Sequence, residues 1–325
     1  MKLPLHRTLR LGPAYVPLTE RGVSLLKPEG RAPVVERPLP AHLRHPGPRL
    51  GVPARPPAGR RSASVGPLPT LLTADVVAAL RAAGCVFAED EARLLVETAA
   101  TPAELAALLG RRVAGEPLEH VLGWAEFCGV RMAVEAGVFV PRRRSELLVR
   151  LAAAVLRPGG VVVELCCGAA AVAAALAALV PDLALHAVDV DPAAVRCARR
   201  NLEPAGGHVH EGDLVEPLPD ALRGRVDVVV ANAPYVPTDA IALMPPEARD
   251  HEPAVALDGG VDGLDVQRRV AAAAPAWLAP GGCLLIETSV RQAPLTAALV
   301  ATAGLVPRVE RDDELDGTAV VGVRA

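Results

Sequence analysis

The chain of 325 residues contains only two lysines, Lys2 and Lys27, and seven aromatic residues. Its six cysteines include no Cys-x-x-Cys pair and no histidine-rich partner spacing, so we expect reduced thiols and no metal site. The longest apolar run, Cys166 to Val180, is shorter than the ~20 residues that span a bilayer, and the N-terminus lacks the apolar segment of a secretory signal. These absences lead us to expect a cytoplasmic protein with no membrane partner.

Positive charge is concentrated at the start of the chain. Residues 1–68 hold twelve Lys or Arg against three Glu, a balance of +9, while the whole chain carries −3, which leaves −12 for the remainder. An acidic remainder argues against a broad nucleic-acid-binding face, because phosphate neutralisation needs clustered cations, although the basic segment could supply one. Residues 1–68 are rich in Pro, Arg and Gly without periodicity, so we expect a disordered tail or an upstream over-extension of the reading frame.

Residues 69–117 have the hydrophobic spacing of a small helical domain. Thr101 is a predicted N-cap, and Glu104 follows it at the spacing of a capping box. The predicted helices begin at Thr73, cover Glu89–Thr98 and cover Pro102–Val113. Residues 118–141 are predicted to form a β-hairpin linker, with β-like segments at Phe127–Val134 and Gly137–Pro141.

In residues 142–325, apolar strands alternate with helices. The predicted strands are Val161–Leu165, Leu183–Val190, Val226–Ala231 and Gly282–Glu287, and the predicted helices are Ala169–Leu179, Ala193–Leu202 and Asp265–Leu278. This alternation predicts an α/β domain with a parallel sheet covered on both faces. Ligands bind such sheets at the carboxyl ends of the strands, so residues just after each strand are candidates for a site.

The first of these strands is followed by a turn of small residues. Glu164 and Leu165 end the strand, and the residues from Cys166 to Ala170 open the next helix. Small side chains let a backbone approach a cofactor closely, and a helix N-terminus offers free N–H groups. Only Gly168 remains of the three glycines usual in such a turn, so ordinary strand-to-helix packing explains it equally well.

Acidic residues follow the next two strands at positions suited to a nucleoside. Asp189 ends the second strand, where an acid can accept both ribose hydroxyls of an adenine nucleoside. Either Asp189 or Asp191 could cap the following helix, and we assign the cap to Asp191. Asp213 could accept from an adenine amino group or be a solvated turn residue. No phosphate-binding lysine accompanies these acids, which favours an uncharged nucleoside tail over NAD.

The most informative segment is Asn232-Ala233-Pro234-Tyr235, directly after an apolar strand. Pro234 confines Ala233 to the extended region, so the Ala233 carbonyl and the Asn232 carboxamide can accept both protons of a planar NH2 group that lies against the Tyr235 ring. Binding both protons localises the nitrogen lone pair toward an aligned, activated methyl group. These residues are the predicted catalytic site for methylation of an amide or exocyclic amine, although a plain Asn-x-Pro turn is about equally consistent.

Together these segments resemble the protein-(glutamine-N5) methyltransferases that modify peptide-chain release factors, the HemK/PrmC family. The resemblance runs from about Leu72 to the C-terminus. Besides the segments above, it rests on Pro117–Gly123, Glu126–Gly129, Val138–Arg142, Glu252-Pro253, Ala256–Gly260, Asp262–Asp265, and Glu287 with Gln292.

The resemblance implies a Rossmann-like class I S-adenosylmethionine-dependent methyltransferase, with a helical domain and hairpin that help to grip the partner. It implies methyl transfer to the glutamine amide in the Gly-Gly-Gln loop of a release factor. We expect the protein to act as a monomer. Asn232 to Tyr235 would hold that glutamine. The cofactor-binding residues that it implies are Glu164, Cys166, Cys167, Gly168, Ala169, Ala170, Asp189, Asp213, Leu214 and Asn232.

Three segments depart from the family pattern. Where the family has Gly-x-Gly-x-Gly, this chain has Cys166-Cys167-Gly168-Ala169-Ala170. Where the family has Asn-Pro-Pro-Tyr, it has Asn232-Ala233-Pro234-Tyr235. Where the family has Pro-Arg-Pro-Glu-Thr-Glu, it has Pro141-Arg142-Arg143-Arg144-Ser145-Glu146. The first change is expected to crowd the methionine end of the cofactor, and the third to remove an acid and add two cations beside the site. The alternatives are therefore a divergent enzyme with another protein substrate or low activity, a nucleic-acid amino methyltransferase acting on adenine N6 or guanine N2, and a non-catalytic protein that binds the cofactor.

Overall fold

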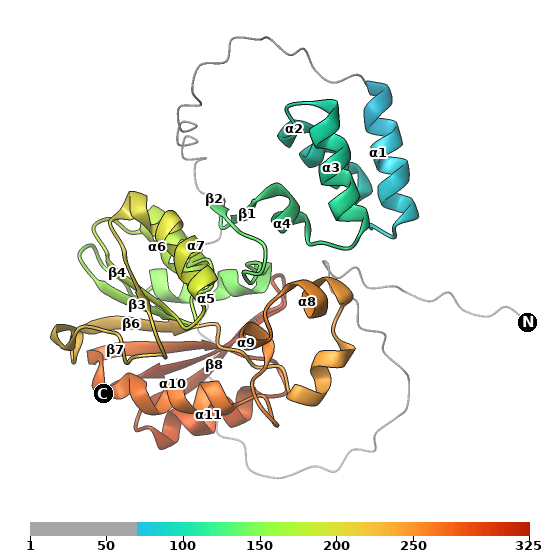
Figure 1. Cartoon of the computed structure of the whole chain (residues 1–325). Helices are drawn as coiled ribbons and strands as arrows, with labels where there is room; N and C mark the ends of the chain where they lie inside the picture. Colours follow the sequence, from blue (N-terminus) through green and yellow to red (C-terminus); the bar gives the residue numbers. More distant parts are fainter. Residues whose placement is uncertain (1–69) are drawn as a thin grey trace, which may run out of the picture. The chain divides into compact units, whose positions relative to one another are not determined.

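The computed structural model describes residues 70–325, so the tail predicted over residues 1–68 lies outside the described part of the chain. Three helices open the described part, a short helix and a hairpin follow, and a seven-stranded sheet with helices on both faces forms the remainder (Figure 1). Among the helices of residues 70–325, none is both long and apolar enough to cross a membrane.

The first helices agree with the prediction, apart from an earlier start of the first one. They are α1 (Thr70–Ala82), α2 (Ala88–Thr98) and α3 (Pro102–Val113). Thr101 caps α3 as predicted, since its hydroxyl accepts from the Glu104 N–H over 3.1 Å, and the Glu104 carboxylate accepts from the Ala100 N–H over 2.7 Å. Leu80 and Leu95 are fully buried in an apolar cluster of these helices.

The linker contains less β-structure than predicted. Its elements are α4 (Leu118–Leu122), β1 (Trp124–Phe127) and β2 (Val130–Ala133). The two strands pair antiparallel around Cys128 and Gly129, whose φ values of 50° and 74° suit a two-residue hairpin turn. The second predicted β-segment, Gly137–Pro141, is wrong because its backbone is paired with a side chain instead of a strand: the Val140 N–H donates to the Glu252 carboxylate over 3.2 Å.

The large sheet has the strand order β5-β4-β3-β6-β7-β9-β8. Its strands are β3 (Val161–Leu165), β4 (Ala184–Asp189), β5 (His208–Glu211), β6 (Val226–Ala231), β7 (Leu278–Glu287), β8 (Val306–Asp312) and β9 (Gly317–Val323). Strands β3 to β7 are parallel, as predicted, but β9 is antiparallel to both β7 and β8. The expected all-parallel sheet is wrong there because only residues 313–316 separate β8 from β9, and a parallel pair needs a crossover of about a dozen residues or more.

Helices cover both faces of the sheet (Figure 1). One face carries α5 (Glu146–Ala153), α6 (Ala171–Leu179) and α7 (Pro192–Leu202), and the other carries α10 (Asp265–Ala273) and α11 (Ala293–Thr302). Neighbouring strand residues alternate between two apolar clusters: Val228 packs with the first group of helices and Val229 with the second. This alternation is expected of strands that are buried on both sides.

An insertion lies between β6 and α10 and contains η5 (Thr238–Leu243), α8 (Pro246–His251) and α9 (Ala254–Leu257). The other one-turn helices are η2 (Arg143–Ser145), η3 (Glu203–Ala205), η4 (Asp220–Leu222) and η6 (Ala274–Ala276). The helix predicted over Asp265–Leu278 already ends at Ala273, because Pro275 has no N–H to continue it. Since the insertion follows β6 directly, it lies at the edge of the sheet where the predicted site residues are found.

Candidate active site

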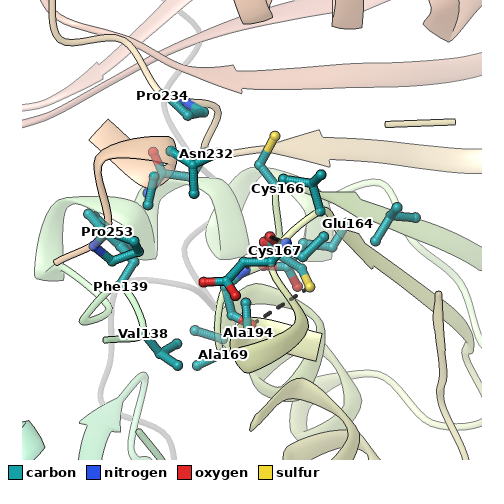
Figure 2. A pocket seen from close by; sticks show the side chains of 18 of the residues that line it. Val138, Phe139, Glu164, Cys166, Cys167, Ala169, Ala194, Asn232, Pro234 and Pro253 are labelled. Atoms are coloured by element: carbon teal, nitrogen blue, oxygen red, sulfur yellow. Dashed lines mark hydrogen bonds between the residues drawn. The ribbon is translucent and has the colours of Figure 1, made fainter. Parts of the chain in front are cut away.

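A cavity of about 290 Å³ lies at the carboxyl ends of β3, β4 and β6 (Figure 2). This volume is near the lower end, ~300 Å³, of the range for small-molecule sites. The predicted site residues that line it are Glu164, Cys166, Cys167, Gly168, Ala169, Asp189, Asp213, Leu214, Asn232 and Pro234. The other three predicted residues, Ala170, Ala233 and Tyr235, are not part of its wall. The cavity therefore gathers residues from segments far apart in the sequence.

The turn after β3 has a left-handed backbone at three alternating positions. The φ values are 53° at Cys166, 53° at Gly168 and 56° at Ala170. These are the positions of the three glycines in the family pattern, so the turn keeps the glycine-type backbone although two of the residues carry a Cβ. Each such residue costs about 1–2 kcal/mol of strain. Burial raises the pKa of the Cys166 thiol to about 12, so the sulfur in the cavity wall is a neutral thiol.

Glu164 holds the start of α6. Its carboxyl oxygens accept from the Val172 N–H over 3.4 Å and from the Ala173 N–H over 2.7 Å. These bonds satisfy N–H groups that would otherwise lack partners at the helix N-terminus, where Ala170 offers no capping side chain. Burial raises the pKa of Glu164 from 4.5 to about 8, so the group is mainly protonated at neutral pH. Glu164 thus fixes the position of the turn that forms one wall of the cavity.

Asp189 connects the ends of β3 and β4. Its Oδ2 accepts from the Gly168 N–H over 2.8 Å, and its Oδ1 accepts from the Asp191 N–H over 2.9 Å. Asp191 caps α7 as predicted, by accepting from the Ala193 N–H over 2.8 Å. Burial raises the pKa of Asp189 above its ordinary value. A carboxylate has about four lone-pair positions, so Asp189 retains capacity for two further donors from a ligand.

Asp213 is paired with a cation that the sequence analysis did not identify. Its Oδ2 accepts from the Arg269 guanidinium of α10 over 2.6 Å, and both side chains line the cavity. The other oxygen, Oδ1, accepts from no group in residues 70–325. Leu214 is buried beside them and supplies apolar surface. This end of the cavity therefore combines an apolar wall with one open acceptor.

Asn232 lies at the end of β6 beside Pro234 and next to Cys166, the first residue of the turn after β3, since Ala231 pairs with Leu165 (Figure 2). Its Nδ2 donates to the Ser145 hydroxyl over 3.3 Å. Its Oδ1 accepts from no donor in the described residues, and the same holds for the carbonyl oxygen of Ala233. Of the two acceptors predicted to bind an NH2 group, Asn232 Oδ1 is therefore open to the cavity, whereas Ala233 is fully buried and lies outside the cavity wall.

Tyr235 belongs to a small network around the buried Glu287, outside the wall of the cavity. Its hydroxyl donates to Glu287 Oε1 over 3.2 Å, and Arg144 Nε donates to the same oxygen over 3.0 Å. The Arg144 guanidinium carbon lies 5.9 Å from the centre of the Tyr235 ring. Burial and the Glu287 charge raise the pKa of Tyr235, so its phenol stays neutral. Arg144 is neutralised by Glu287 and does not add the free cation expected at this position.

Gln292 fastens the backbone of the acceptor segment. Its Nε2 donates to the carbonyl oxygens of Tyr235 over 3.0 Å and Asp262 over 3.2 Å, while its Oε1 accepts from the Ser289 hydroxyl over 2.7 Å. Gly263 packs so closely that a Cβ there would lie 2.4 Å from the Tyr235 carbonyl oxygen and 2.5 Å from Gln292 Nε2. Its φ of 75° also favours glycine. Only glycine fits at this contact between the insertion and the acceptor segment.

The site residues that sequence reasoning missed are tertiary contacts. Ser145 is separated from Asn232 by 87 positions, and Arg269 from Asp213 by 56. No local spacing signals such pairs, although the family resemblance had matched Glu287 and Gln292 without giving them a role. In residues 70–325 no group of three His, Cys, Asp or Glu side chains is arranged to hold a metal ion.

Known proteins are similar to this chain over a region that includes strands of the large sheet. Residues 130–244 match the family described as methyltransferase small domain. The release factor glutamine methyltransferase of Geobacter sulfurreducens is 38% identical over 228 residues, which cover 69% of this chain and 79% of that protein. That of Streptomyces coelicolor is 42% identical over 55% of this chain and 65% of its own length. The 4-amino-L-phenylalanine/4-methylamino-L-phenylalanine methyltransferase of Streptomyces pristinaespiralis is 36% identical over 60% of this chain and 68% of that protein.

Proposed function

The chain belongs to the family of release factor glutamine methyltransferases, and we propose that it methylates the side-chain amide nitrogen of the glutamine in the Gly-Gly-Gln loop of a peptide-chain release factor, with S-adenosylmethionine as methyl donor. The observation that carries this proposal is Asn232 Oδ1, an unengaged acceptor in the wall of the cavity at the end of β6.

The residues around the cavity fit S-adenosylmethionine. The turn from Cys166 to Ala170 brings backbone and small side chains to one wall, where larger side chains would fill the space. Asp189 has lone pairs left for the ribose hydroxyls, and Asp213 Oδ1 is open to the adenine amino group beside the apolar Leu214. When bound, the cofactor supplies a methyl group activated by the sulfonium. We assign these residues to hold its nucleoside.

The acceptor residues supply orientation. An amide nitrogen is a poor nucleophile because its lone pair is delocalised into the carbonyl, and hydrogen bonds from both of its N–H groups help to localise that pair. We assign Asn232 Oδ1 as the acceptor that faces the cavity. The Ala233 carbonyl oxygen, the second predicted acceptor, is kept in the extended region by Pro234 but belongs to a residue that is fully buried in this structure. Neither oxygen is basic at neutral pH, so these groups align the nitrogen and do not remove its proton. Such alignment can contribute ~7–11 kcal/mol of the barrier in favourable cases.

A protein acceptor fits the charges at the junction before α5 better than a nucleic acid does. Arg142 donates to the buried Glu252 carboxylate over 2.5 Å, and Arg144 donates to the buried Glu287. Of Arg142, Arg143 and Arg144, only Arg143 is exposed and makes no ion pair within residues 70–325. A groove that tracks phosphates needs several free cations, which this junction does not offer.

Methyl transfer from labelled S-adenosylmethionine to four acceptors tests the proposal. The acceptors are a purified release factor, the same factor with the Gly-Gly-Gln glutamine replaced by alanine, a mixture of RNA and DNA, and 4-aminophenylalanine. We expect label only in the intact release factor, identified on the glutamine by mass spectrometry. Label confined to nucleic acid or to the aromatic amine would reject the proposed acceptor.

Asn232→Ala is expected to abolish transfer and to leave the affinity for S-adenosylhomocysteine within roughly tenfold, about 1.4 kcal/mol. The variant loses one of the two amide acceptors but keeps the ribose and adenine contacts. Calorimetry gives the affinity, and Asp239→Ala, an exposed change in the neighbouring insertion, is the control. Wild-type turnover by Asn232→Ala would contradict the role of Asn232. Absence of binding to the wild type at millimolar ligand would contradict the cofactor assignment.

A further inference from the structure

The one-turn helix η2 contacts both parts of the acceptor segment through two adjacent residues. Ser145 accepts the Asn232 hydrogen bond, and Arg144 binds Glu287, which in turn holds the Tyr235 hydroxyl. We propose that Ser145 and Arg144 are positioning residues for the methyl acceptor: Ser145 fixes the plane of the Asn232 carboxamide, and Arg144 fixes Tyr235 through Glu287. This inference rests on the proposed function, because it concerns the same site.

Ser145 is the last residue of η2 and is buried. It is therefore suited to fix the plane of the Asn232 carboxamide. Its side chain is 4% exposed, lines the cavity and lies 3.3 Å from Asn232 Nδ2. A carboxamide that donates to this hydroxyl turns its oxygen away from Ser145. The flipped carboxamide would present an NH2 group to the NH2 group of the acceptor, donor against donor. The Ser145 hydroxyl can accept or donate, so it fixes the plane of the carboxamide, and the bound acceptor selects the orientation with Oδ1 toward it.

Arg144 is suited to fix Tyr235 because it balances a buried charge. Glu287 is 2% exposed, its Oε1 accepts from both Arg144 and the Tyr235 hydroxyl, and its Oε2 has no partner in the described residues. A buried carboxylate needs a compensating cation, and the Tyr235 hydroxyl supplies only a neutral donor. Loss of Arg144 would leave Glu287 uncompensated and release the group that holds the phenol in place.

The Arg144 contact separates acceptor geometry from cofactor binding. Arg144, Glu287 and Tyr235 do not line the cavity, so changes in this network are expected to spare the affinity for the cofactor. The network instead reaches the segment that follows β6, since Glu287 ends β7 and the neighbouring Ile286 is paired with Ala231. A change at Arg144 should therefore appear in kcat or in the KM for the release factor, with little change in the binding of S-adenosylhomocysteine. Ser145 does line the cavity, so its role is tested by comparing two variants of equal bulk.

Ser145→Val and Ser145→Thr form a matched pair, because both add a branched Cβ and only threonine keeps the hydroxyl. We expect Ser145→Val to lower kcat roughly tenfold, the effect of one lost hydrogen bond, and Ser145→Thr to stay within about threefold of the wild type. Because both variants add the same bulk to the cavity wall, their dissociation constants for S-adenosylhomocysteine should agree within about threefold. Equal kcat values for the two variants would overturn the role of Ser145.

Arg144→Glu tests the second contact, with Arg143→Glu as the control that makes the same charge change on the exposed neighbour. We expect Arg144→Glu to lower kcat/KM roughly a hundredfold, and the double variant Arg144→Glu with Glu287→Arg to recover at least about tenfold. Arg144→Lys, which keeps the charge, is the milder variant should Arg144→Glu not fold, and it should stay within about tenfold. An equal loss in Arg143→Glu would assign the effect to long-range charge and overturn the role of Arg144.

A titration of Tyr235 tests the network without methyl transfer. The chain has two tyrosines, Tyr15 and Tyr235, so in a Tyr15→Phe background the ultraviolet absorbance of phenolate reports Tyr235 alone. Glu287→Gln removes the charge beside the phenol, and phenolate should then form at a lower pH than in the Tyr15→Phe protein. An unchanged titration would overturn the Tyr235–Glu287 contact. A shifted titration in a protein that methylates no release factor would reject the proposed function and leave the positioning network intact.

Discussion

Replacing Glu164 by glutamine tests how the turn after β3 is held to α6. The carboxyl group is fully buried, and its two oxygens accept from N–H groups at the start of α6. Glutamine has nearly the same shape and keeps one oxygen that can accept from the closer donor, the Ala173 N–H. It cannot ionise, so it removes the pH dependence that Glu164 contributes to the free energy of unfolding.

The size of that contribution follows from the pKa. Burial raises the pKa of Glu164 to about 8 in the folded protein, against 4.5 for the ordinary group. A rise of about 3.5 corresponds to at most ~5 kcal/mol, and the positive end of the α6 dipole favours the charged form, so about 2–4 kcal/mol is expected. Because the folded pKa is the higher one, this stabilisation is fully present below pH 4.5 and is lost as the pH rises through about 8.

Urea unfolding of both proteins at about pH 5, 7 and 9 measures the effect. Other groups titrate in the same way in both proteins, so the difference between the two free energies of unfolding isolates Glu164. We expect the wild type to lose about 2–4 kcal/mol relative to Glu164→Gln between about pH 5 and pH 9. Two curves that stay parallel within about 1 kcal/mol would show that the buried carboxyl keeps an ordinary pKa and would refute the reasoning.

Two further changes probe packing and acid stability. Gly263→Ala should lower the free energy of unfolding in urea by about 2–3 kcal/mol more than Gly304→Ala does. Both glycines have positive φ, but a Cβ at Gly304 meets nothing within 4 Å. Equal losses in the two variants would disprove the close contact at Gly263. Burial lowers the pKa of His186 from 6.5 to about 4, so its stabilising contribution is complete above pH 6.5 and is lost as the pH falls toward 4. His186→Gln should weaken the acid dependence of unfolding in this interval by about 2 kcal/mol, and identical acid curves would contradict the assignment.

The strands that the sequence predicts most accurately are Val161–Leu165 and Val226–Ala231, which are mainly apolar with one acidic residue each. Both lie in the centre of the sheet, where both faces are covered by helices. Strand β8 escaped prediction because it is an edge strand, largely exposed and rich in charged residues, so it has no buried face to give its sequence a period. Strand β9 is apolar and buried but was not predicted either, so the antiparallel end of the sheet was missed.

The candidate site divides in the same way between local and distant contacts. The capping role of Asp191 and the position of Asn232 at a strand end follow from neighbours in the sequence, and both were predicted. The Ser145 and Arg269 contacts join elements that meet only in the folded protein, so no spacing in the sequence reveals them. The positive φ at Cys166 was also hidden, because cysteine has no preference for that region.

The torsion angles at Cys166 and Ala170 bear on how such loops change in evolution. Each of these amino acids is one base substitution away from glycine in the genetic code, so a lineage can move between the two states in single steps. Here both residues hold the left-handed φ that glycine adopts without strain, at an energetic cost of about 1–2 kcal/mol for each Cβ. Selection at these positions therefore acts on a dihedral angle and on side-chain size, and a search that demands three glycines would pass over relatives that retain the loop.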